Sequence, residues 1–480
     1  MKRRPNVVFI MSDQQRWDML SCNDPEFVIT PNLQRLADSG LNCKRCFTTT
    51  PVCTPACAAL FTGLYSTSAG AFANQIPLHE GVKNIGQYIS EAGYQTGYIG
   101  KWHLDGPAGR YYGTGVAPDG FPQSWWYDGK DFQNDVGPDG FKKWSVGAGL
   151  TDSDCWGTRL ADRACRFIEA HSKTEAPFFL VASFDEPHGP SSAPERYYDM
   201  YRGTKRKRSP SFDDALTDKP YAHRALRAYQ KNGGCVPAGE DPNNSPRYYG
   251  CNTYLDDQIG RILDAIDRNC LDETIVIYTV DHGDHAGAHQ LLAKGATMYE
   301  DITRVPLLIR APGITAPGAR TERLVSHIDL APTVFKLCGI PLPDTHDAHS
   351  GKRTFNFEGQ DMSEFLAQPD RQARDAVFME YSRFGLPHST RLGFTPIRCI
   401  RTETHKLVVN LLDTDELYDL TADPYEVKNR INDPALATIR NGLHDRLLDW
   451  MDVREDPFRG NGWWQRAWRP EKMMPPDSEP

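Results

Sequence analysis

Ionisable side chains follow two apolar segments of the sequence, at the point where a buried strand would end. Asp13 comes shortly after the segment 6–11, and Asp281 and His282 come directly after 274–280. The carboxyl ends of strands are where open α/β sheets place their binding sites. Two carboxylates and an imidazole suit a hard or borderline divalent cation. The pattern favours a metal site, although Asp13 taken alone fits a turn cap equally well.

A cysteine lies directly before a predicted helix in the segment 51–63. Pro55 suits the first turn of this helix, and Gly63 suits its end. At a helix N-terminus the dipole and the free amides attract anions and lower the pKa of a thiol. Most single cysteines at such a position are inert, so Cys53 is a candidate nucleophile only because of its neighbours.

Four further side chains follow predicted strands or lie in the loop after Asp281: Lys101, His103, His188 and Lys294. Ammonium and imidazole groups around a metal suit an anionic tetrahedral substrate. Each of these residues alone is typical of an ordinary surface. Their combination with the predicted metal ligands favours an active site.

The elements that must position these residues alternate along the chain. Short apolar segments predict buried strands, and amphipathic segments predict helices, which together indicate an α/β fold with a mostly parallel sheet. The predicted strands are 6–11, 95–100, 178–184, 274–280 and 307–309, and the predicted helices are 31–39, 84–92 and 248–267. Two weakly periodic insertions, 105–150 and 185–245, are expected beyond the carboxyl ends of the strands.

The sequence changes character after about residue 370, where shorter β-like segments precede a helix and a tryptophan-rich tail. We expect a catalytic α/β domain over 1–370, a smaller C-terminal α+β subdomain with a short sheet over 371–460, and a tail over 461–480. The tail tryptophans Trp463, Trp464 and Trp468 predict a subunit contact, and thus a homo-oligomer, because exposed aromatic clusters often mark interfaces.

Composition excludes several classes of protein. The 63 acidic residues outnumber the 54 basic ones, and the net charge of −9 argues against a nucleic-acid partner. No segment is long and apolar enough to predict a membrane span, and the N-terminus lacks a secretory signal. The 12 cysteines form no zinc motif. These features predict a cytoplasmic protein, or a periplasmic or secreted one if a signal peptide was removed.

With these residues in view, the sequence resembles the sulfatase family of the alkaline-phosphatase-like superfamily. The resemblance implies an alkaline-phosphatase-like sandwich, in which helices flank a large, mostly parallel central sheet. The motifs that carry it run in family order through most of the chain: NVVFIMSDQQ, TPNLQRLADSG, CTPACAALFTG, GYQTGYIGKWHL, DEPHGP, YLDDQIGRILDAI, TVDHGDHAGAHQLLAKGATMYEDITRVPLLI and ELYDLTADPYEVKN.

The resemblance implies a catalytic formylglycine (3-oxoalanine), which a maturation enzyme makes by oxidising Cys53. It also implies one divalent metal ion, bound by the formylglycine together with Asp13, Asp281 and His282, with Gln14 as a further ligand. Calcium is the usual ion of the family, and the imidazole ligand makes manganese the second choice.

The same resemblance assigns roles to the cationic residues. Lys101 and Lys294 hold the sulfate oxygens, and His188 contacts the substrate and protonates the leaving alcohol. His103 handles the second hydroxyl of the hydrated aldehyde. The implied reaction is the hydrolysis of a sulfate ester, either of a sulfated carbohydrate or of a small organic sulfate. Trp125, Trp126 and Tyr127 could stack on a sugar ring or simply pack within their loop.

Two positions depart from the family pattern. Cys57 stands where the family has an arginine that assists maturation and supports the formylglycine, and Ser12 stands where many members have a second aspartate. Two alternatives therefore stay open. The first is a phosphonate monoester or phosphodiester hydrolase with the same site, and the second is a non-catalytic relative.

Overall fold

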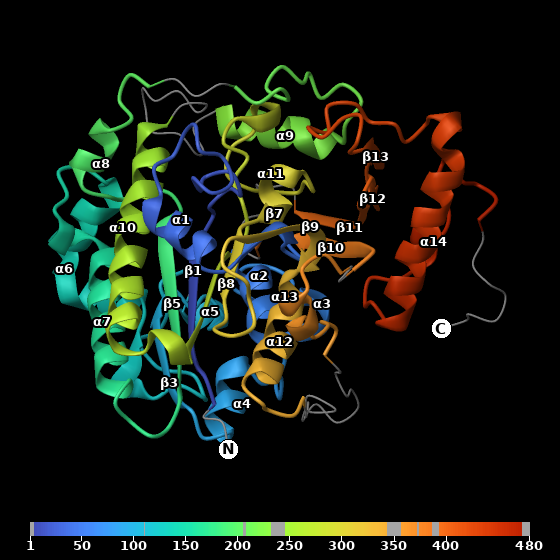
Figure 1. Cartoon of the computed structure of the whole chain (residues 1–480). Helices are drawn as coiled ribbons and strands as arrows, with labels where there is room; N and C mark the ends of the chain where they lie inside the picture. The colour runs from blue at the N-terminus through green and yellow to red at the C-terminus, as the bar shows by residue number, and fades with distance from the viewer. Residues whose placement is uncertain are drawn as a thin grey trace.

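Two separate β-sheets organise the chain (Figure 1). The computed structural model describes residues 4–109, 111–204, 208–231, 245–342, 357–371, 374–385 and 393–472. Within these residues, nine strands form the large sheet, in the order β4-β3-β5-β1-β6-β8-β2-β7 with β9 beside β2. Four later strands form a small sheet in the order β10-β11-β12-β13.

The centre of the large sheet is parallel. Strand β1 (Asn6–Asp13) pairs in parallel with β5 (Phe178–Pro187) and β6 (Thr274–Val280), and β5 pairs with β3 (Gln95–Gly100). Every residue of β1, β5 and β6 is buried, as expected for strands that helices cover on both faces. The four central strands predicted from the sequence are confirmed.

Antiparallel pairing occurs on one side of the large sheet. Strand β8 (Leu307–Arg310) runs antiparallel to β6 and to β2 (Leu41–Phe47). The remaining strands are β4 (Trp126–Tyr127), β7 (Arg304–Val305) and β9 (Ala319–Ser326). Because β2 and β9 contain several charged residues, they lack the continuous apolar pattern that predicts the central strands.

Helices cover both faces of the large sheet (Figure 1). Helices α1 (Pro31–Asp38), α7 (Trp156–His171) and α10 (Pro246–Asn269) pack together on one face. Helices α2 (Cys53–Thr62), α4 (Ile85–Glu91) and α12 (Leu330–Leu337) pack together on the other. The other helices are α3 (Ser66–Ala69), α5 (Gly106–Gly109), α6 (Gly129–Val146), α8 (Glu195–Asp199), α9 (Tyr221–Tyr229), α11 (Glu300–Thr303), α13 (Ser363–Ala367) and α14 (Ala437–Val453).

The small sheet is fully antiparallel and packs on both sides. Its strands are β10 (Ala376–Arg383), β11 (Phe394–Thr402), β12 (His405–Asn410) and β13 (Glu416–Asp419). One face contributes to a core with α14, and the other packs against Val52 and Met298, residues close in sequence to Cys53 and Lys294. The small sheet therefore supports two segments that carry predicted site residues.

The tail tryptophans do not form an exposed aromatic surface. Trp463 is only 1 % exposed and Trp464 is 9 % exposed, and Trp468 packs against the same core under α14. They belong to the hydrophobic core of this chain or pack against it. They are therefore not the exposed aromatic cluster on which the predicted subunit contact depends.

The insertion 105–150 is more regular than its composition predicts, because it contains β4 and α6. Trp126 and Tyr127 are buried, and the Trp126 ring stacks on Tyr98 with centroids 5.2 Å apart. Trp125 packs edge-on against Phe167. The packing interpretation of these aromatic residues is therefore correct.

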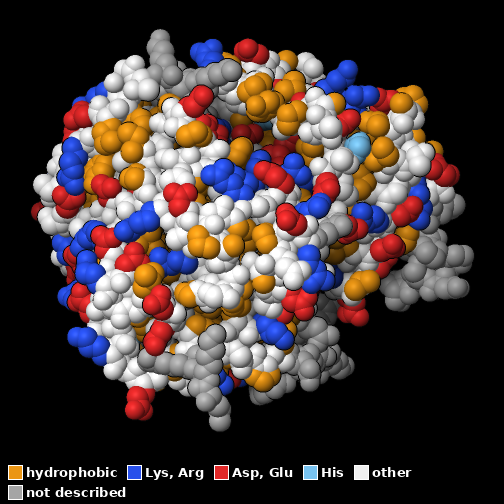
Figure 2. Space-filling model, viewed as in Figure 1, with side chains coloured by type: hydrophobic (Ala, Val, Ile, Leu, Met, Phe, Trp, Pro, Cys, Tyr) orange, Lys and Arg blue, Asp and Glu red, His pale blue; other side chains and the backbone are white. Residues whose placement is uncertain are grey.

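On the face in Figure 2, basic and acidic side chains are interspersed, and hydrophobic side chains occur in scattered groups.

Candidate active site

The metal ligands predicted from the sequence lie on neighbouring strands. Strands β1 and β6 are adjacent and parallel, so Asp13 at the end of one lies beside Asp281 directly after the other. Gln14 has a φ of 64°, a left-handed conformation that costs of order 1–3 kcal/mol in a residue other than glycine. This turn directs the chain away from the sheet immediately after Asp13.

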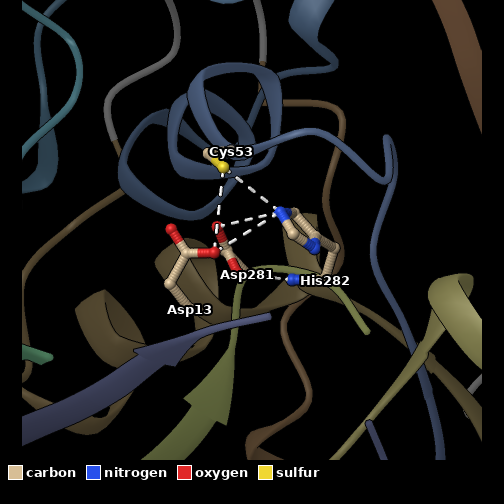
Figure 3. A group of neighbouring side chains, drawn as sticks. All are labelled: Asp13, Cys53, Asp281 and His282. Carbon is tan, nitrogen blue, oxygen red and sulfur yellow. Dashed lines mark hydrogen bonds and ion pairs between the residues drawn. The ribbon is translucent and has the colours of Figure 1, made fainter. Parts of the chain in front are cut away.

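Asp13, Cys53, Asp281 and His282 form one buried group with ligand atoms within 4.8 Å of one another. The Cys53 sulfur points from the start of α2 toward the other three side chains (Figure 3). Cys53 Sγ lies 3.3 Å from His282 Nε2 and 3.7 Å from Asp13 Oδ1. His282 Nε2 lies 3.5 Å from Asp281 Oδ2. These spacings allow one ion to contact several of the four groups.

The hydrogen bond of His282 fixes which ring nitrogen faces this group. Nδ1 lies 2.9 Å from the carbonyl oxygen of Gly283, which can only accept a hydrogen bond. Nδ1 therefore carries the proton, and the lone pair of Nε2 faces the two carboxylates. Burial lowers the pKa of His282, which keeps the imidazole neutral as a metal ligand requires.

The charges of the group also favour a cation. Burial, followed by the Asp13 carboxylate, raises the pKa of Asp281 well above its usual value. Burial alone would also raise the pKa of Asp13. The positive charges of Lys101 and other cations have the larger effect and hold this pKa well below its usual value. A divalent ion would relieve the repulsion between the carboxylates, so the donor set fits the metal that the resemblance implies.

Helix α2 begins with Cys53, after an extended residue at Val52. The first turn is held from outside: Thr54 N–H donates to Asn74 Oδ1 at 3.0 Å, and Thr54 Oγ1 donates to the His103 carbonyl at 2.9 Å. The expectation of a lowered thiol pKa is wrong for this structure. Burial, followed by Asp13, raises the pKa of Cys53, because these effects exceed those of the nearby lysines.

Lys101 lies between two carboxylates. Its ammonium pairs with Asp13 Oδ2 and lies 3.1 Å from Asp185 Oδ1. The Tyr111 ring covers the same ammonium at 3.7 Å, and the Tyr111 hydroxyl donates to Asp185. Sequence reasoning missed Asp185 and Tyr111. Asp185 lies near the end of β5, so the rule that located Asp13 and Asp281 would have located it as well, whereas Tyr111 lies in a loop without a sequence signal.

Lys294 reaches the group from the loop that follows β6. Its ammonium donates to Gln14 Oε1 at 2.5 Å and lies 3.9 Å from Asp13 Oδ1. Gln14 Nε2 donates to Asp284 Oδ2 at 2.6 Å. The amide oxygen that the resemblance assigns to the metal thus contacts Lys294 in this structure, and the role of Gln14 as a ligand stays a prediction.

His103 and His188 both lie close to Tyr111, each with its ring centroid 5.2 Å from the tyrosine ring. His103 is buried and has a left-handed backbone with a φ of 58°. His188 is half-buried. Burial, followed by a nearby lysine, lowers the pKa of both imidazoles well below the usual value. The structure therefore brings every predicted site residue to one end of the central strands.

Cys57 lies one helical turn after Cys53 and is also buried, at 2 % exposure. Burial, followed by Asp281, raises the pKa of its thiol well above the usual value. This side chain brings no positive charge to the group, whereas Lys101 and Lys294 both act on Cys53 from outside its helix.

Glu186, beside Asp185, predicts a pH dependence of stability. Burial, followed by Asp185, raises its pKa from 4.5 to about 8. Between these two pH values the folded state binds more protons than the unfolded state, so stability falls as the pH rises. We expect Glu186→Gln to remove this slope and to raise the free energy of unfolding at pH 8 by a few kcal/mol. Urea unfolding at pH 5 and pH 8 measures both effects.

The exposed Glu169 on α7 provides the control for this prediction. Glu169→Gln should leave the pH slope of the wild-type protein unchanged. An equal slope in the wild type and in Glu186→Gln would show that Glu186 is ionised in the folded protein.

Comparison with known proteins decides the family. A family model described as Sulfatase matches residues 5–340, well over half of the chain. The chain belongs to the sulfatase family. A second model, described as N-sulphoglucosamine sulphohydrolase, C-terminal, matches residues 287–453. As a sulfatase, the protein is a hydrolase that acts on sulfuric ester bonds, as its resemblance to the family implies.

Individual relatives of this sulfatase cover nearly all of it. It is 36 % identical to the uncharacterized sulfatase YidJ of Escherichia coli, over 97 % of this chain and 91 % of the relative. It is 28 % identical to an ulvan-active sulfatase of Formosa agariphila, over 97 % and 84 % of the two chains. The phosphonate monoester hydrolase of Agrobacterium radiobacter has the same fold, with a TM-score of 0.77, 26 % identity, and coverage of 94 % and 96 %.

These comparisons confirm the alkaline-phosphatase-like fold that the family resemblance implies. No helix in the described part of the chain combines the length and the hydrophobicity that a membrane span requires.

Proposed function

We propose that this sulfatase hydrolyses sulfate esters of carbohydrates at a formylglycine derived from Cys53. The observation that carries the proposal is the buried group of Asp13, Cys53, Asp281 and His282, which Lys101 and Lys294 approach from separate loops. Two ammonium groups and a cation site around one nucleophile position match the charge of a sulfate ester in its transition state.

A formylglycine at position 53 would supply a hydroxyl nucleophile once hydrated, and a divalent ion held here would supply positive charge that favours an anionic ester. Asp13, Asp281 and His282 would hold the ion, with the group at position 53 and the Gln14 oxygen, which also accepts from Lys294, as further ligands. We assign Ca²⁺ as the first choice and Mn²⁺ as the second, because carboxylates suit calcium whereas the imidazole nitrogen also suits manganese. Maturation of Cys53 requires a formylglycine-generating enzyme as a partner.

The residues of the chain supply the remaining steps. Lys101 and Lys294 neutralise the sulfate oxygens that gain charge as the ester bond breaks. His103, whose carbonyl accepts from Thr54 in the first turn of α2, would take the proton from the second hydroxyl while the bond between carbon and the sulfate oxygen breaks, which would release sulfate and restore the aldehyde. His188 donates a proton to the leaving alcohol, and the negative charge of the bound ester raises the proton affinity of its imidazole.

His188→Ala tests the role of the acid through the leaving group. For a sugar sulfate, whose alkoxide needs a proton, we expect kcat/KM to fall by roughly 10²–10⁴-fold. For nitrophenyl sulfate the loss should be far smaller, because nitrophenolate leaves without a proton. Equal losses with both esters, measured by steady-state kinetics, would assign His188 to binding rather than to acid catalysis.

The carbohydrate substrate is proposed from two observations. The ulvan-active sulfatase is similar over most of both chains, and the half-buried His188 with the nearby Tyr111 offers polar and aromatic surface for a sugar ring. Release of inorganic sulfate from a panel of sulfated mono- and oligosaccharides, compared with choline sulfate and nitrophenyl sulfate, tests the class of substrate.

A phosphonate monoester or phosphodiester hydrolase is the second candidate, favoured by the likeness to the phosphonate monoester hydrolase. The sulfate, the phenylphosphonate and the phosphodiester of one nitrophenol separate the two functions. We expect the highest kcat/KM with the sulfate. A preference for either phosphorus ester would favour the second candidate, and no turnover of any ester would favour a non-catalytic relative.

A further inference from the structure

Asp284 holds two parts of the candidate site at once. It is 8 % exposed and lies in the turn after His282. Its Oδ1 accepts from the N–H groups of Ala286 at 2.7 Å and Ala293 at 3.0 Å, and its Oδ2 accepts from Gln14 Nε2 at 2.6 Å. None of the cations in the described ranges lies within ion-pair distance of it, so these N–H donors balance its charge.

Asp284 accepts from the backbone N–H groups of two residues that have the left-handed conformation. Ala286 has a φ of 42° and Ala293 has a φ of 50°. Such conformations persist only where the surrounding contacts hold them. Ala293 directly precedes Lys294, so the carboxylate fixes the backbone from which the lysine side chain extends. Gln230 holds the same loop one residue earlier, through hydrogen bonds to both the N–H and the carbonyl of Leu292.

The third contact of Asp284 determines how the Gln14 amide points. A carboxylate only accepts hydrogen bonds and an ammonium only donates them. Gln14 lies between the two, so its NH₂ group must face Asp284 and its oxygen must face Lys294, at 2.5 Å. The Asp284 side chain, which accepts from Gln14 Nε2, therefore sets the orientation of an amide beside Asp13.

We infer that Asp284 is a positioning residue of the active site, which orients the Gln14 oxygen and thereby holds the Lys294 ammonium beside Asp13. The inference rests on the proposed function for the role of Lys294 in binding the substrate. The contacts of Asp284 themselves are independent of the ester that the enzyme cleaves.

A reciprocal exchange of the two side chains separates positioning from simple structural support. In Asp284→Asn the new NH₂ group opposes the Gln14 NH₂ group, and a rotated Gln14 would turn its NH₂ group against Lys294. In Gln14→Glu two carboxylates oppose each other. In the double variant the introduced amide at position 284 donates to the introduced carboxylate at position 14. That carboxylate also accepts from Lys294, so every donor again has an acceptor.

The experiment measures kcat/KM for nitrophenyl sulfate, the dissociation constant for Ca²⁺ by calorimetry, and the unfolding temperature. We expect Asp284→Asn to lower kcat/KM and the affinity for the ion by roughly 10–100-fold. The double variant should recover at least tenfold in both quantities. Its kcat/KM and its affinity for the ion should also be higher than those of Gln14→Glu alone. This comparison can be made even if Asp284→Asn does not fold.

Asp256 provides the matched control, because it is buried and has the same three kinds of donor. It accepts from the backbone N–H groups of Asn32 and Leu33, at the start of α1, and from the side-chain amide of Asn32. Asp256→Asn should lower the unfolding temperature, leave kcat/KM unchanged, and combine additively with Gln14→Glu. The inference is overturned if the double variant shows only the product of the two single losses, or if Asp284→Asn behaves like Asp256→Asn. An inactive wild type would overturn the proposed function instead, and the cycle of Ca²⁺ affinities would still test Asp284.

Discussion

Cys53→Ala is expected to reduce kcat for sulfate esters by at least about 10⁴-fold, because alanine has no thiol through which a maturation enzyme could oxidise Cβ to the aldehyde. The sulfur of Cys53 lies at the entrance to α2 and points at the predicted metal ligands, 3.7 Å from Asp13 Oδ1. Lys101, Lys294 and the histidines stay in place in this variant. Binding of inorganic sulfate should therefore survive the loss of turnover.

The control for this variant is Cys43→Ala. Cys43 is equally buried but lies in β2, away from the group of site residues. It should lose some stability through its cavity and should retain kcat within about threefold of the wild type. Substantial turnover by Cys53→Ala, measured with nitrophenyl sulfate, would mean that the nucleophile comes from another residue.

Removal of the divalent ion is expected to abolish activity and to destabilise the fold. Without the ion, the carboxylates of Asp13 and Asp281 face each other in a buried site, where burial and Asp13 already raise the pKa of Asp281. An ion at 100 times its dissociation constant stabilises the folded state by about 2.7 kcal/mol. Dialysis against a chelator should lower both kcat and the free energy of unfolding in urea.

Adding back single ions distinguishes the two metal assignments. Ca²⁺ should restore both activity and stability, with Mn²⁺ the next most effective, whereas Mg²⁺ should be weaker because it retains its water shell. An Asp281→Asn variant controls for effects of the chelator outside the site, since its stability should respond much less to the chelator. Full activity after exhaustive chelation would exclude the proposed role of the ion.

Much of this site is predictable from the sequence because its residues follow strands. Segments such as 6–11 and 274–280 are apolar throughout, which identifies buried parallel strands, and the polar residues after them must then meet at one edge of the sheet. Asp13, Asp281 and His282 are found in this way. The positions of Lys101, His103, His188 and Lys294 follow from the family motifs that contain them.

The residues that position this machinery were harder to predict. Tyr111 reaches Lys101 from an irregular insertion, and Asp284 acts through the left-handed turns at Ala286 and Ala293, which have no periodic signal. The charges around Cys53 could also not be predicted from the sequence. A sequence identifies a helix N-terminus, but only the structure shows the burial and the Asp13 carboxylate that raise the pKa of the thiol.

The most direct test of the central claim is the mass of the peptide that contains Cys53 and Cys57, from protein purified from its native host. We expect residue 53 to have the lower mass of an aldehyde, or the mass of its hydrate, and residue 57 to keep a free thiol. An unmodified thiol at both positions, in protein that hydrolyses sulfate esters at full rate, would contradict it.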